Sequence, residues 1–129
     1  MIPAFPALVT ALALLLYVGI FVSVGRARLR YGIVAPAVTG APEFERLFRV
    51  QQNTLEQLVW FTPALWLFAL TVSSLWAGLI GLVWIAARSY YAVSYYRDAE
   101  TRGPGFVAAF ASAGLLLVGA IIGILARLL

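Results

Sequence analysis

The chain has 129 residues, of which 64% are hydrophobic and 11% are charged, and its formal net charge is +4. So little polar surface does not suit a water-soluble domain of this size, and the composition indicates an integral membrane protein. The sequence contains neither cysteine nor histidine. This excludes disulfides, thiolate nucleophiles, imidazole bases and the common zinc sites, so we expect no metal centre.

Four apolar segments reach or approach the roughly 20 residues that a helix needs to cross a bilayer core of about 30 Å. They account for most of the chain, so any active site must lie within or beside them. We therefore expect an all-α fold, an integral membrane four-helix bundle that forms a single domain over residues 1–129. The expected spans are about Ala4 to Val24, Leu55 to Val72, Leu75 to Tyr95 and Phe106 to Leu125.

The first span begins without the basic region of a secretory signal, and we interpret it as a retained helix rather than a cleaved leader. It runs on to Arg26, Arg28 and Arg30. Because these arginines alternate along the chain, at most two of them can point toward one site on a helix. The cluster is also explained as an anchor that fixes the orientation of the first helix in the membrane.

The three connections differ in length. In the first and longest, Pro36 and Gly40 interrupt any helix that continues from the first span, and Pro42 suits the first position of the next helix. We expect that second helix to begin outside the bilayer and to continue as one rod to about Val72. The second connection is almost absent, which predicts an antiparallel hairpin, and the Gly-Pro-Gly sequence that starts at Gly103 predicts a stop before the last span.

Eight of the nine arginines flank the first or the third connection. The positive-inside rule assigns these connections to the cytoplasm and both termini to the opposite side. Nucleic acid is a poor candidate partner, because no basic run with aromatic stacking platforms lies outside the expected spans. Short loops and the lack of targeting motifs favour a multi-pass protein of a bacterial inner membrane, and the composition is also compatible with a eukaryotic endomembrane.

A polar stripe marks the start of the second helix. Arg46, Arg49, Asn53 and Glu56 are spaced so that they share one helical face, and Arg49 to Glu56 covers about 10 Å at roughly 1.5 Å per residue. Ionisable groups in or beside a span are costly, by about 2.5 to 3.5 kcal/mol at its centre, so they face a bundle interior or a wet cavity. The stripe suits an extended polar ligand.

Two interpretations of Glu56 are open: a structural partner for an arginine such as Arg49 or Arg88, or a carboxylate that holds the ammonium group of a ligand. In the second case Asn53 can donate to and accept from a peptide-like ligand, and Arg49 can bind a ligand carboxylate.

Arg88, Tyr91 and Tyr95 share a face of the third span, where the two hydroxyls could reach the same polar site. Tyr90 and Tyr96 lie off this face and are also explained as an interfacial belt. We expect the tryptophans and phenylalanines to face lipid.

The segment from Pro42 to Glu56, PEFERLFRVQQNTLE, resembles the second-helix signature of the MAPEG family, the membrane-associated proteins in eicosanoid and glutathione metabolism. The resemblance is to the branch of leukotriene C synthase and microsomal glutathione transferase, and it extends over almost the whole chain. It implies a four-helix protomer in a homotrimer. Glutathione, as cosubstrate, would bind between neighbouring protomers near the cytoplasmic boundary of the membrane.

The resemblance also implies roles for individual residues. Arg102 would occupy the place of the catalytic arginine that stabilises the glutathione thiolate. Because the nucleophilic sulfur arrives with the cosubstrate, such an enzyme needs no cysteine or histidine of its own. The sequence departs from the family at Gln57, where many relatives have tyrosine, and at Leu29 and Tyr90, where the synthase branch has arginines. The residues expected to bind glutathione are Arg28, Arg49, Gln51, Asn53, Glu56, Arg88, Tyr91 and Tyr95.

Three functions follow from these observations. The first is a membrane glutathione transferase, with or without glutathione peroxidase activity, whose thiolate attacks a lipophilic electrophile or hydroperoxide that enters from the membrane lipid. The second is a non-enzymatic lipid-binding or scaffolding protein of the same fold. The third is a small four-helix transporter with Glu56 as a proton-linked site, which leaves the pattern of Arg49, Asn53, Tyr91 and Tyr95 unexplained.

Overall fold

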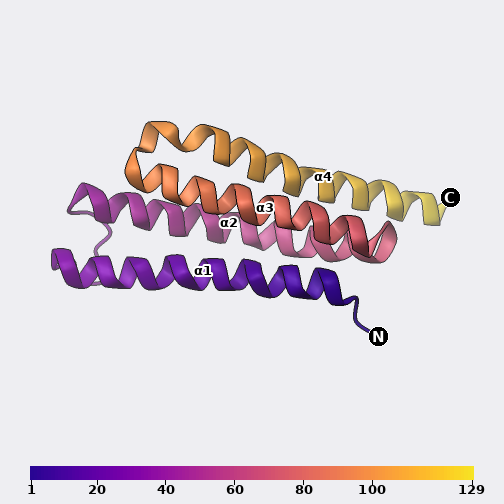
Figure 1. Ribbon diagram of the computed structural model, residues 1–129, viewed down its shortest axis with the longest axis horizontal. Coiled ribbons are helices and arrows are strands. Elements are labelled where there is room, and N and C mark those ends of the chain that lie inside the picture. Colours follow the sequence, from indigo (N-terminus) through magenta and orange to yellow (C-terminus); the bar gives the residue numbers. More distant parts are fainter.

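The computed structural model describes all 129 residues and shows the expected all-helical bundle of four long helices, each antiparallel to the next one along the chain (Figure 1). The prediction of the fold class is confirmed. The helices are α1 (Ala4–Tyr31), α2 (Pro42–Thr71), α3 (Ser74–Arg97) and α4 (Gly103–Leu128), with a short 3-10 helix, η1 (Ala99–Arg102), between α3 and α4.

The helix boundaries follow from local chemistry. α1 continues beyond its expected span to Tyr31 and ends at Gly32, whose left-handed φ of 67° lets its N–H donate to the carbonyl of Arg28. α2 begins at Pro42, as predicted. The Gly-Pro-Gly sequence lies within the first turn of α4 rather than in the connection. Proline is tolerated there because the first N–H groups of a helix have no intrahelical acceptor.

Three segments are long and apolar enough to cross a membrane: α1, α3 and the stretch Ala99–Leu128. α2 was expected to contain a fourth span but does not meet the same requirement, since polar residues continue along it as far as Gln57. It nevertheless extends over 30 residues and lies alongside the other helices (Figure 1). The most polar helix is therefore held within the bundle by three apolar ones.

The connections α1–α2 and α3–α4 meet at one end of the bundle, and the tight α2–α3 turn and both termini lie at the other (Figure 1). The arginines that flank the two longer connections are consequently gathered at one end, which we call the arginine end. Which side of a membrane this end faces remains a prediction.

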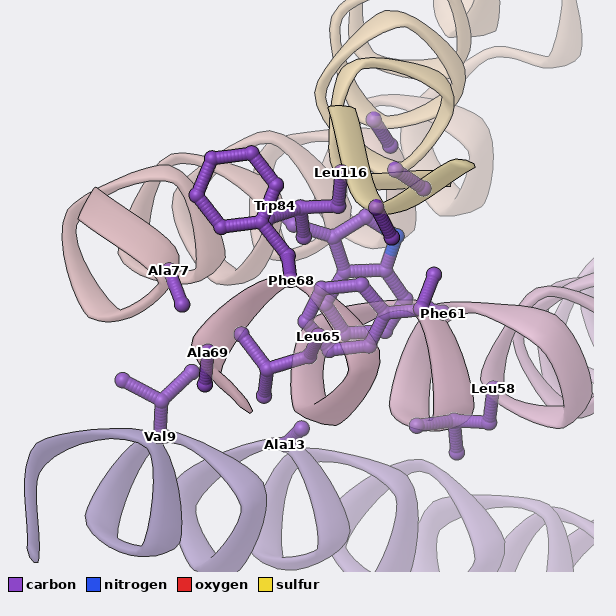
Figure 2. Packing of buried hydrophobic residues seen from close by; sticks show 14 of the residues in the cluster. Val9, Ala13, Leu58, Phe61, Leu65, Phe68, Ala69, Ala77, Trp84 and Leu116 are labelled. Carbon is purple, nitrogen blue, oxygen red and sulfur yellow. The ribbon is translucent and has the colours of Figure 1, made fainter. Parts of the chain in front are cut away.

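The core is built around α2. Figure 2 shows side chains of α2 between Val9 and Ala13 of α1 on one side and Leu116 of α4 on the other. Phe61 and Trp84 are both fully buried and stack with ring centroids 4.0 Å apart. The expectation that tryptophans and phenylalanines face lipid is wrong for this pair, because α2 and α3 pack together along these rings.

Candidate functional site

A groove of about 600 Å³ runs along α2 at the arginine end, and we call it the α2 groove. All four residues of the predicted polar stripe line it, together with Tyr95 from α3 and Ala99 from η1. One helix face therefore supplies most of the polar groups, as the spacing along the sequence predicts. The full lining consists of Val38, Thr39, Pro42, Glu45, Arg46, Phe48, Arg49, Gln52, Asn53, Glu56, Tyr95 and Ala99.

The charged ends of the groove are open to a ligand. Arg49 and Glu56 are exposed, and the hydrogen bonds of this region engage Arg46 and Asn53 instead. Arg46 Nε donates to the carbonyl of Tyr96 at 2.9 Å, which ties the start of α2 to the end of α3. Arg49 and Glu56 thus present a free cation and a free carboxylate two turns apart on one helix face.

Asn53 connects the groove to a second layer of residues. Its Nδ2 donates to the hydroxyl of Tyr91, which is almost fully buried. The rings of Tyr91 and Tyr95 meet edge to face at 5.6 Å between centroids. Tyr95 therefore lines the groove, whereas Tyr91 lies behind Asn53 and supports it.

Arg88 is buried still deeper, with 0% of its surface exposed. Its Nε donates to Thr54 Oγ1 at 3.1 Å, and its guanidinium lies 4.0 Å from the ring centroid of Tyr91. Both terminal nitrogens lack a hydrogen-bond partner. Arg88 itself does not line the groove and is linked to it by its contact with Tyr91, which accepts from Asn53.

One turn along α2, the side chain of Gln57 is also buried, and its Oε1 accepts from Trp84 Nε1 at 2.9 Å. Its Nε2 and the two terminal nitrogens of Arg88 are the buried side-chain polar atoms without a partner. Sequence reasoning assigned no structural role to Thr54 or Gln57. Their spacing of three residues, beside the polar stripe on the same helix, was the available signal.

Arg102 lies at the rim of the α2 groove. Its guanidinium is 5.4 Å from the ring centroid of Tyr95, and its Nη1 donates to the carbonyl of Ala99 at 2.6 Å. Tyr95 and Ala99 both line the groove, but Arg102 itself is exposed and does not.

Two other predicted site residues are not brought to the groove of their own chain. Arg28 Nη1 donates to the carbonyl of Ala37 at 2.7 Å, and its guanidinium lies 5.0 Å from the ring centroid of Phe44. It thereby holds the first connection against the end of α1. Gln51 is half-buried and does not line the groove, since it lies two residues beyond Arg49 and faces another side of α2.

The comparisons with known proteins agree with this architecture. The profile of the MAPEG family matches residues 6–122. An uncharacterized protein of Synechocystis sp. is 50% identical over 95% of this chain and 90% of its own length. Microsomal glutathione S-transferase 2 of Mus musculus is 43% identical over 82% of this chain and 72% of its own. Leukotriene C4 synthase of Cavia porcellus is 37% identical over 95% of this chain and 82% of its own length. The chain therefore belongs to the MAPEG family.

Proposed function

We propose that this protein is a membrane-bound glutathione transferase. In this proposal it binds glutathione in the α2 groove and stabilises the thiolate for attack on a lipophilic electrophile or hydroperoxide. The observation that carries the proposal is the α2 groove itself, with a free arginine, an amide and a free carboxylate along one helix face. Family membership and the relatives that are named glutathione transferases support it.

The chemistry of glutathione matches the groove. The tripeptide carries two carboxylates, one ammonium group and two peptide bonds in an extended chain. Arg49 would bind a carboxylate through its fork of donors, and Glu56 would accept from the ammonium group. Asn53 would bind the peptide backbone between them. The groove volume of about 600 Å³ lies within the range of about 300 to 1,000 Å³ that is usual for small-molecule sites.

The reacting sulfur would lie near the rim. A guanidinium close to the sulfur favours the ionised form of the thiol, and the thiol proton leaves to water at the open end of the groove. The thiolate then forms a carbon–sulfur bond with the electrophile, whose leaving group or opened ring takes the electron pair. With a hydroperoxide, the thiolate would attack the terminal peroxide oxygen and break the O–O bond, which releases the lipid alcohol and leaves a glutathione sulfenic acid. A second glutathione would then form the disulfide and release water. We assign the thiolate-stabilising role to Arg102.

We further propose that the active assembly is a homotrimer. Arg28 and Gln51 lie outside the groove of their own chain, and in the trimer implied by the family resemblance they would serve the groove of the neighbouring protomer. The arginine end would face the cytoplasm, in a bacterial inner membrane, where glutathione is available. The first connection, held by Arg28, would then contribute to two grooves.

Calorimetric titration of the detergent-purified protein with glutathione tests the proposal, with turnover of a hydrophobic electrophile and of a lipid hydroperoxide measured in parallel. Binding that is weakened by Arg49→Gln but not by Arg127→Gln, together with turnover, supports a transferase. Arg127 is a suitable control because it lies near the end of α4, beside Thr71. Binding without turnover would favour the second function, a non-enzymatic lipid-binding or scaffolding protein of the same fold. No binding would refute the proposal.

A further inference from the structure

A second groove, of about 770 Å³, lies between α1 and α3 and shares no lining residue with the α2 groove. We call it the α1–α3 groove. Its walls are mostly aliphatic, from Leu15 and Ile20 of α1 to Val93 of α3. Both α1 and α3 are long and apolar enough to cross a membrane. This groove is therefore formed by two helices that can each cross a membrane.

The polar end of this groove is cationic. Arg97 lines it directly, and an adjoining cavity that shares Ser23, Leu47 and Tyr96 with it adds Arg26 and Arg30. All three arginines are exposed. No acidic residue lines either cavity. The apolar α1–α3 groove thus ends at three cations, and neither the groove nor the adjoining cavity has an acidic residue to balance them.

We propose that the α1–α3 groove binds one anionic phospholipid, with an acyl chain along the groove and the phosphate on the three arginines. The dimensions fit this occupant. Leu15 and Arg26 are separated by about 16 Å along α1, at roughly 1.5 Å per residue. One leaflet provides about half of a hydrocarbon core that is about 30 Å thick. Arginines at the membrane surface attract anionic headgroups. The charge of the groove and its length therefore both fit an anionic phospholipid.

Gly19 offers a direct way to close the groove. It lines the groove, and a Cβ atom added there meets no other atom within 4 Å. Gly19→Leu should therefore fold normally and place its side chain in the space that the acyl chain would occupy. Gly114 has the same free space around an added Cβ but lies on α4, outside this groove. Gly114→Leu is thus a matched control.

The test is native mass spectrometry of the full-length protein in detergent, after incubation with phosphatidylglycerol or with phosphatidylcholine of identical acyl chains. We expect a preferential phosphatidylglycerol adduct, one per protomer. Gly19→Leu should abolish it and Arg97→Gln should reduce it about fivefold, whereas Gly114→Leu and Arg127→Gln should leave it unchanged.

Equal retention of the two lipids would overturn the proposal, and so would an adduct that persists in Gly19→Leu. An adduct lost equally in the two controls would also overturn it, because the loss would not be specific to this groove. The measurement does not involve glutathione, so its result is independent of the transferase proposal.

Discussion

The guanidinium of Arg88 lies 4.0 Å from the ring centroid of Tyr91, whose hydroxyl in turn accepts from Asn53 in the α2 groove. A buried cation is thus connected to the groove through two side chains. A buried cation whose terminal nitrogens are unpaired contributes little to the stability of the fold. We interpret it as a group that fixes the ring of Tyr91, and through it Asn53, by cation–π attraction.

Arg88→Met tests this interpretation, since it keeps a long side chain but removes the buried charge. We expect the free energy of unfolding in detergent to be unchanged or higher, while the affinity for glutathione falls. Thermal unfolding and calorimetry measure the two quantities. A large loss of stability with unchanged affinity would show that Arg88 is structural.

Tyr91→Phe retains the ring beside Arg88 and removes the acceptor for Asn53. One net hydrogen bond contributes about 0.5 to 1.5 kcal/mol, so we expect glutathione to bind roughly 2- to 10-fold more weakly with little change in stability. Tyr90→Phe is the matched control, because Tyr90 is exposed and lies outside the groove. Equal effects of the two substitutions would argue against a specific role for the Tyr91 hydroxyl.

Glu56→Gln keeps the size of the side chain and removes its charge. Because hydrogen bonds to charged groups contribute more than neutral ones, we expect glutathione affinity to fall roughly 10- to 100-fold. Stability should not change, since Glu56 is exposed. Glu100→Gln, which changes an exposed carboxylate outside the groove, should bind glutathione normally. Unaltered binding by Glu56→Gln would exclude an ammonium contact at this position.

Complementation tests whether Arg28 serves a neighbouring groove. Arg28→Ala and Glu56→Gln should each reduce glutathione turnover when expressed alone. If Arg28 and Glu56 act on one groove from different chains, coexpression of the two variants creates some grooves that contain both original side chains. Activity should then be partly restored. Activity no higher than that of the two single variants would indicate that the side chains do not meet across an interface.

Gly105→Ala should destabilise the bundle at the site. An added Cβ would lie 2.7 Å from backbone atoms of Tyr91, so α4 must move away from α3, at a cost of about 1 to 3 kcal/mol. Gly114→Ala, where an added Cβ meets nothing, should be neutral or stabilising by up to about 1 kcal/mol. Thermal unfolding in detergent compares the two. Equal stabilities would contradict the close α3–α4 contact.

The helices and the polar stripe could be predicted because both depend on local sequence. Pro42 begins α2 as expected, and Arg46, Arg49, Asn53 and Glu56 line one groove because their spacing follows the helical repeat. These features require no knowledge of how the helices pack together.

The burial of Trp84 could not be predicted in the same way, whereas the burial of Arg88 follows from the cost of exposing a charged group to lipid. In a membrane protein, lipid-facing and core-facing positions are both apolar, so hydropathy does not separate them. Which face is buried depends on the packing of α3 against α2. The contacts of Arg28 could not be predicted for another reason. Its carbonyl acceptors belong to the long first connection, and no periodic pattern in the sequence describes the path of that connection.

The central claim is that the protein stabilises the glutathione thiolate through Arg102. Its most direct test is an ultraviolet difference spectrum of the detergent-purified protein with saturating glutathione near neutral pH, compared with Arg102→Ala and with Arg97→Ala as a control. We predict a thiolate band that is lost in Arg102→Ala and retained in Arg97→Ala. A band of equal intensity in Arg102→Ala, or no band in the unmodified protein, would contradict the claim.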